Sequence, residues 1–122
     1  MFEVTETAAV ANMTEAQAFA DQLQSLGCRL ALDDFGTGFG SFTYLRNLPA
    51  DYLKIDMAFV HNLENSEADL RVVKAVVSVA ARFGQKTIAE GVEDEVTLGL
   101  LREAGVDYAQ GYFLGRPATA RV

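Results

Sequence analysis

The stretch Leu30–Phe42 reads LALDDFGTGFGSF, and the interpretation of the whole chain starts from it. A short apolar run is followed by two adjacent aspartates, and three glycines then stand within five residues. Apolar runs of this kind are typical of strands that are buried on both faces of a parallel sheet. Asp33 and Asp34 would then lie at the carboxyl end of a strand, which is where α/β folds carry their chemistry.

Helical spacing of apolar side chains appears in three other parts of the chain. These segments are residues 13–26, 66–83 and 94–104. Each is followed or closed by a glycine that predicts the helix end, namely Gly27, Gly84 and Gly105. Thr14 and Gln17 have the spacing of a capping box and predict the start of the first helix. A further short helical turn is expected around Ser41–Asn47, before Pro49.

Strand-like segments alternate with these helices. They are residues 1–6, 29–34, 52–56, 85–90 and 106–111, and each is largely apolar with polar residues at its end. Strands that alternate with helices indicate βαβ units and therefore a parallel sheet. The predicted fold class is α/β, with parallel βα repeats.

Length, composition and charge limit the function classes. The 122 residues, half of them hydrophobic, suffice for one compact domain. A net charge of -7 disfavours nucleic acid and anionic membranes as partners but is compatible with a cation-binding cleft. One cysteine, Cys28, and one histidine, His61, exclude a disulfide framework and a Cys/His zinc site. The apolar run 75–81 is far shorter than the roughly 18 residues of a membrane helix, so the segment is expected to be cytoplasmic.

Polar residues at the carboxyl ends of the predicted strands are the candidates for a site. They are Glu3, Glu6, Asp33, Asp34, Lys54, Asp56, Glu90, Glu93 and Gln110. The carboxyl ends of parallel strands meet at one edge of a sheet, so these side chains are expected to lie near one another. The alternative is that they cap helices or face solvent where the strands emerge.

Adjacent carboxylates indicate a cation site. Asp33 and Asp34 repel one another, and a bound cation removes that repulsion. Oxygen ligands favour Mg²⁺ or Mn²⁺, and two neighbouring carboxylates on opposite sides of the backbone can each serve one ion of a pair. Such a pair can cleave a phosphodiester with Lys54 orienting the attacking water, although Lys54 can also be a surface residue. The Asp34–Gly36 motif does not indicate a kinase, because no HRD-type loop accompanies it.

Five motifs in this order resemble the EAL-domain family of cyclic di-GMP phosphodiesterases. They are EVTE at 3–6, DDFGTGFGSF at 33–42, LPADYLKID at 48–56, TIAEGVE at 87–93 and AQGYFLGRP at 109–117. The resemblance implies a TIM-like (β/α)₈ barrel. It also implies hydrolysis of cyclic di-GMP to linear pGpG with two Mg²⁺ or Mn²⁺ ions.

The resemblance also implies roles for individual residues. Metal ligands would be Glu3, Asp33 and Asp34. Catalytic residues would be Lys54, Asp56 and Glu90, with Glu93 and Gln110 lining the pocket. Glu6 would tether a regulatory loop formed by Phe35, Gly36, Thr37, Gly38, Phe39, Gly40 and Ser41. In this loop, Phe39 and Gly40 stand where tyrosine and serine are common in the family.

The 122 residues contain no Glu-Ala-Leu motif. We therefore expect residues 1–122 to form the carboxyl-terminal half of an EAL domain, roughly half of a barrel. Half a barrel exposes sheet edges, so homo-oligomers that complete the sheet are expected. Three functions remain open: half of a phosphodiesterase that is weakly active or inactive alone, a non-catalytic module that binds cyclic di-GMP or metal, and an oligomerising structural fragment.

Overall fold

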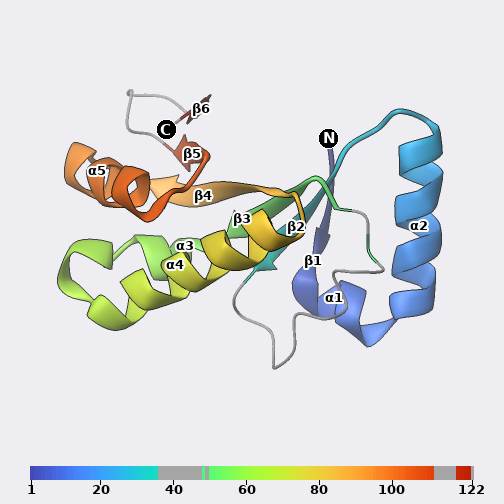
Figure 1. Ribbon diagram of the computed structural model, residues 1–122, viewed down its shortest axis with the longest axis horizontal. Helices are drawn as coiled ribbons and strands as arrows, with labels where there is room; N and C mark the ends of the chain where they lie inside the picture. The colour runs from blue at the N-terminus through green and yellow to red at the C-terminus, as the bar shows by residue number, and fades with distance from the viewer. Residues whose placement is uncertain (36–47, 49, 112–117, 122) are drawn as a thin grey trace.

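A six-stranded sheet organises the computed structural model, which describes residues 1–35, 48, 50–111 and 118–121 (Figure 1). Its strands are β1 (Phe2–Thr5), β2 (Leu30–Phe35), β3 (Tyr52–Ile55), β4 (Lys86–Val92), β5 (Tyr108–Gly111) and β6 (Ala118–Arg121). They are ordered in the sheet as in the chain, and β1 to β5 are parallel. In a TIM-like barrel each strand is added next to the preceding one in the same direction, whereas in a doubly wound sheet the strand order reverses. The order seen here is that of a TIM-like barrel. The five predicted strands are confirmed, whereas β6, antiparallel to β5, was not predicted.

The three predicted helices are present, with shorter companions. The helices are α1 (Glu6–Ala11), α2 (Met13–Ser25), α3 (Met57–Val60), α4 (Glu67–Arg82) and α5 (Glu95–Ala104), with a 3₁₀ turn at Leu63–Asn65. The predicted closing glycines Gly27, Gly84 and Gly105 have φ angles of 74°, 70° and 93°, which glycine adopts without steric cost. The expected turn at Ser41–Asn47 lies outside the described residues. No helix in the described part of the chain is long and apolar enough to cross a membrane.

The predicted capping box at Thr14 and Gln17 is wrong, and Asn12 takes this role. The Asn12 side-chain oxygen accepts a hydrogen bond from the Glu15 backbone N–H at 3.2 Å, and its amide donates to the Glu15 carboxylate at 3.0 Å. The reason is α1, which ends at Ala11 and leaves Asn12 as the only residue between two helices. Thr14 therefore lies inside the first turn of α2, where its side chain cannot cap.

The described helices pack on one face of the sheet. In Figure 1, α3 and α4 lie beside β3 and β4, and α2 lies near β1 at the other end of the sheet. Apolar side chains of the strands form the core with those of the helices, among them Leu53 and Ile55 of β3 and Val73 and Val76 of α4. Side chains alternate along a strand, so Lys54, between Leu53 and Ile55, points to the opposite face. That face carries the candidate site.

Two aspartates secure the amino ends of the strands. Asp51 accepts a hydrogen bond from the Leu30 backbone N–H at 2.9 Å, and Asp107 accepts one from the Thr87 backbone N–H at 2.9 Å. The Asp107 N–H in turn donates to the Thr87 hydroxyl at 3.1 Å. These bonds tie neighbouring strands together at the edge opposite the candidate site, so the strands that carry the site are fixed at their far ends.

Candidate functional site

A bulge at the end of β2 brings Asp33 and Asp34 to the same place. Asp34 has a φ of 53°, and the pairing of β2 with β3 shifts between Leu32 and Phe35. The Asp34 backbone N–H donates a hydrogen bond to Asp33 Oδ1 at 2.9 Å. A regular strand would send the two side chains to opposite faces, but the left-handed residue breaks this alternation. The prediction that the two carboxylates lie on opposite sides of the backbone is therefore wrong.

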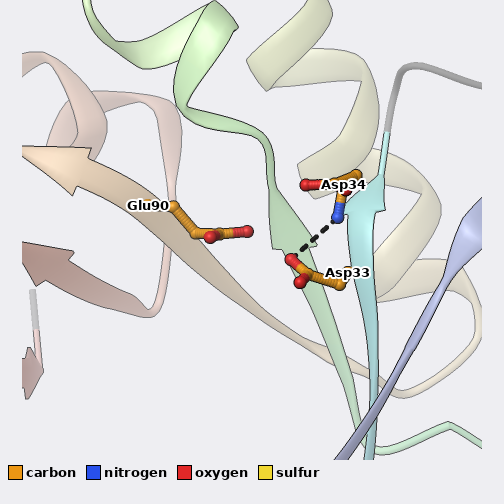
Figure 2. A group of neighbouring side chains, drawn as sticks. All are labelled: Asp33, Asp34 and Glu90. Atoms are coloured by element: carbon orange, nitrogen blue, oxygen red, sulfur yellow. Dashed lines mark hydrogen bonds between the residues drawn. The ribbon is translucent and has the colours of Figure 1, made fainter.

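Glu90 of β4 completes a cluster of three carboxylates with the two aspartates. One oxygen from each of Asp33, Asp34 and Glu90 lies within 4.8 Å of the other two. Figure 2 shows the Glu90 side chain reaching across β3 toward the aspartates of β2. Glu90 Oε1 is buried and has no hydrogen-bond partner among the described residues. Two strands, β2 and β4, thus build one acidic centre at the carboxyl edge of the sheet.

Lys54 lies between the strands that carry these carboxylates. Its Nζ is 2.6 Å from Glu3 Oε1 and 3.9 Å from Glu90 Oε2, and its side chain is only 6% exposed. Burial lowers the pKa of Lys54, but the hydrogen bond to Glu3 and the charge of Glu90 outweigh it, so the net shift is upward. The ammonium group therefore stays charged at neutral pH. The alternative interpretation of Lys54 as a surface lysine is wrong.

The pKa values of the three carboxylates are shifted in different directions. Burial, and then the neighbouring Asp33, raise the pKa of Glu90 to about 8. The hydrogen bond with Glu90 lowers the pKa of Asp33, and partial burial and the charge of Asp33 raise that of Asp34. Carboxylates that crowd together avoid the repulsion of three full charges when one of them keeps a proton. At neutral pH and without a cation, Glu90 holds that proton.

A hard divalent cation fits this donor set. All three side chains offer oxygen, the ligand type that Mg²⁺ and Mn²⁺ prefer. The buried Glu90 Oε1 lacks a partner within the described residues, and a cation would supply one. The site therefore has the chemistry of a metal centre.

The other predicted site residues lie around this cluster or away from it. Gln110 is opposite Glu90 in the pairing of β4 with β5, and Asp56 precedes α3 and hydrogen-bonds with Asp34. Glu3 is paired with Lys54 and lies outside the three-carboxylate cluster. The Glu93 side chain is 70% exposed, with Oε1 3.9 Å from His61 Nε2.

The predicted regulatory loop is described only at its start. Phe35 was predicted to belong to the loop, but it is the last residue of β2 and is fully buried in the core. Gly36, Thr37, Gly38, Phe39, Gly40 and Ser41 lie outside the described residues. Glu6 is buried in the first turn of α1. Its predicted tether to that loop stays a prediction.

Sequence reasoning missed the part that His61 plays beside the site. Its imidazole packs on Gly91, the residue that follows Glu90. The available signal was Gly91 itself, because a glycine inside a strand pattern often marks a bulge or a close approach.

The sheet and the acidic centre define a class: a TIM-like α/β domain with a metal-type site at the carboxyl ends of its strands. A model of the EAL domain family matches residues 1–117, and the chain belongs to this family. It is 47% identical over 116 residues to the cyclic di-GMP phosphodiesterase PdeB of Shewanella oneidensis, covering 95% of this chain and 14% of PdeB. It is 41% identical over 117 residues to the cyclic di-GMP phosphodiesterase PdeF of Escherichia coli K12, covering 96% of this chain and 16% of PdeF.

Solved EAL structures have the same fold over this region. The PaMucR phosphodiesterase in complex with c-di-GMP superposes with a TM-score of 0.88 at 39% identity. That comparison covers 94% of this chain and 47% of the solved chain. The EAL domain of Mycobacterium smegmatis DcpA superposes with a TM-score of 0.83 at 39% identity, covering 94% of this chain and 52% of the other. The chain thus spans about half of these solved chains, and its fold is part of the EAL barrel.

Proposed function

We propose that residues 1–122 form the carboxyl-terminal half of an EAL domain and supply half of a metal-dependent cyclic di-GMP phosphodiesterase site. The observation that carries this proposal is the cluster of Asp33, Asp34 and Glu90 with Lys54 beside it, at the carboxyl edge of a barrel-type sheet. PdeB and PdeF, which are similar over almost the whole chain, are named cyclic di-GMP phosphodiesterases. The PaMucR structure holds c-di-GMP.

The metal site of the proposed enzyme takes Mg²⁺ or Mn²⁺, two ions in all. Asp33, Asp34 and Glu90 would hold metal with their oxygen atoms, and Glu3, which is hydrogen-bonded to Lys54, would be a further ligand. When bound, the two ions supply an activated water and a charge that stabilises the leaving oxygen. A bound metal would also offset the negative charge that the carboxylate cluster presents to the phosphates of the substrate.

The side chains of this chain orient the reactants around the metal. Lys54 donates a hydrogen bond that fixes the attacking water, and Asp56 supports the position of Lys54 or the second metal. Glu90 would hold the metal as a carboxylate and would give up its proton to solvent. Glu93 and Gln110 line the substrate pocket, and Glu6 connects the site to the loop that follows Phe35. Hydrolysis would open the cyclic dinucleotide to linear pGpG: the water oxygen bonds to one phosphorus, the bond from that phosphorus to one ester oxygen breaks, and a proton from the water ends on the released hydroxyl.

A hydrolysis assay tests this proposal. Residues 1–122 would be joined to the amino-terminal half of the PaMucR EAL domain, and release of pGpG would be followed by chromatography with Mg²⁺ or Mn²⁺. We expect turnover by the joined domain and a loss of about 100-fold or more on Asp33→Asn, since the amide is a weak metal ligand. Asp21→Asn, which changes an exposed carboxylate of α2, is the matched control and is expected to retain full activity.

Other outcomes of the same assay would contradict hydrolysis and identify a different function. Retention of cyclic di-GMP without turnover would indicate a binding module. Neither binding nor turnover in a folded joined domain would indicate a structural fragment. The 122-residue chain alone is expected to show weak turnover or none, and strong turnover by it would contradict its assignment as half a site.

The proposal includes a location and an assembly. The substrate is a second messenger, so we place the activity in the cytoplasm. β1 is an edge strand, and both its first residue, Phe2, and the preceding Met1 are exposed, so we propose that two copies of the 122-residue chain associate through this edge. Sedimentation equilibrium tests the assembly, and a monomer at every concentration would contradict it.

A further inference from the structure

We infer that His61 and Met57 are positioning residues for Glu90, and that they act by packing on the backbone of Gly91. The inference rests on the proposed function in one respect, namely that Glu90 holds metal. It concerns α3, the single helical turn that leaves β3 after Asp56 and lies against β4. Asp56 directly precedes this turn, and the turn packs against β4, which carries Glu90.

The contact with Gly91 leaves no space for a side chain. Gly91 has a φ of 75°, and a Cβ atom added to it would lie 2.8 Å from Met57 Cβ and 2.9 Å from His61 Nε2. The first residue of α3 and the residue that follows its last turn therefore lie directly on the backbone between Glu90 and Val92. Any shift of α3 is transmitted to that backbone, because packed atoms cannot overlap.

The opposite side of this segment is held by β5. The pairing of β4 with β5 shifts between Glu90 and Val92, so the segment is a bulge. A Cβ atom on Gly111 would collide with the Val92 carbonyl oxygen and would lie 2.7 Å from the Val92 nitrogen. Bulges aim side chains in directions that a regular strand does not allow. The bulge is thus packed against α3 on one side and Gly111 on the other, and Glu90 points at Asp33 and Asp34.

His61 contributes mainly through this packing. Its Nε2 also lies 3.9 Å from Glu93 Oε1, but the two side chains are 47% and 70% exposed. An ion pair so open to water contributes little to structure. Water does not weaken the packing of the ring on Gly91 in this way, because that packing does not depend on charge. A ring of similar size without nitrogen should therefore replace the imidazole.

Two glycine variants separate positioning from backbone strain. Gly91→Ala introduces a Cβ at a φ of 75° into a filled space, and Gly84→Ala introduces one at a φ of 70° where no other atom lies within 4 Å. Both variants carry the strain of alanine in the left-handed region. We expect Gly91→Ala to weaken Mn²⁺ binding, measured by electron paramagnetic resonance on the 122-residue chain, by about tenfold or more. Gly84→Ala is expected to bind Mn²⁺ like the unmodified chain.

Two histidine variants test the ring itself. His61→Ala is expected to lower Mn²⁺ affinity by roughly three- to tenfold, and His61→Phe to restore it. A readout that needs no metal accompanies these titrations: the backbone amide NMR signals of Asp33 and Asp34 in the metal-free chain. These signals should move in Gly91→Ala and His61→Ala and stay in place in Gly84→Ala and His61→Phe.

The two readouts distinguish failure of the inference from failure of the proposed function. If the unmodified chain binds no Mn²⁺ but the amide signals move as expected, the proposed metal site fails and the positioning role stands. If His61→Ala leaves the amide signals and the Mn²⁺ affinity unchanged, the inference is overturned. It is equally overturned if Gly84→Ala has the same effects as Gly91→Ala, because backbone strain would then explain both.

Discussion

Replacing Lys54 with methionine is expected to lower cyclic di-GMP hydrolysis by the joined EAL domain by about 10²–10⁴-fold without weakening Mn²⁺ binding. The Lys54 ammonium is a cation 3.9 Å from Glu90 and hydrogen-bonded to Glu3, so its charge opposes a second cation at the same carboxylates. Its removal leaves the ligands more negative, and Mn²⁺ affinity should stay equal or rise. The water that Lys54 orients would lose its donor, and hydrolysis would slow by that factor. Steady-state release of pGpG and a Mn²⁺ titration of the same sample measure the two effects.

The matched control for this experiment is Lys74→Met, which removes an exposed lysine from α4. It makes the same chemical change on an exposed side chain outside the cluster of Asp33, Asp34 and Glu90, and is expected to leave both hydrolysis and Mn²⁺ affinity unchanged. Methionine also keeps most of the volume of the lysine stem, so the packing around residue 54 should survive. A joint loss of metal affinity and hydrolysis in Lys54→Met would contradict the role in orienting water and would indicate that Lys54 holds the site together.

The repeating parts of the fold could be predicted because they depend on short-range patterns. Helical spacing that closes on a glycine identified α2, α4 and α5, and apolar runs with polar endings identified the five parallel strands. The start of α2 was misplaced because Thr14 and Gln17 satisfy a local pattern, whereas α1 determines where the next helix begins. The antiparallel β6 is four residues long and contains no apolar run, so nothing local indicated it.

The sequence could group residues that lie together in the candidate site, but it could not predict their geometry. Parallel strands in register bring their carboxyl ends together, and this is why Asp33, Lys54 and Glu90 could be grouped from sequence. Alternation along a strand places Asp33 and Asp34 on opposite faces, and only the bulge at Asp34 reverses this. Bulges depend on how two strands pair, which a single strand does not encode. The same limit applies to Gly91, whose packing partners come from α3.

A second large effect is expected from pH. Mn²⁺ affinity of the 122-residue chain should rise about tenfold per pH unit from about pH 5.5 to 7.5 and level off above about pH 8. The reason is Glu90, because burial and the neighbouring Asp33 raise its pKa to about 8, and a metal must displace that proton. Titration calorimetry near pH 7 in two buffers of different ionisation enthalpy should show about one proton released per metal ion.

Stability of the metal-free chain should follow the opposite trend with pH, and this gives an independent check on the same proton. The pKa of Glu90 in the folded chain, about 8, is above its ordinary value of 4.5, so its protonated form favours the fold. That contribution is complete below about pH 4.5 and is lost as the pH rises through about 8, and Mn²⁺ should restore it. The pKa of Asp34 is raised and acts in the same direction, whereas that of Asp33 is lowered and matters only in acid. Urea unfolding with and without Mn²⁺ measures the trend.

Glu90→Gln should greatly reduce both pH dependences, that of Mn²⁺ affinity and that of stability. Glu103→Gln, on the exposed face of α5, should preserve them. A Mn²⁺ affinity that is flat across this range in the unmodified chain, or equally steep in Glu90→Gln, would show that another group holds the proton.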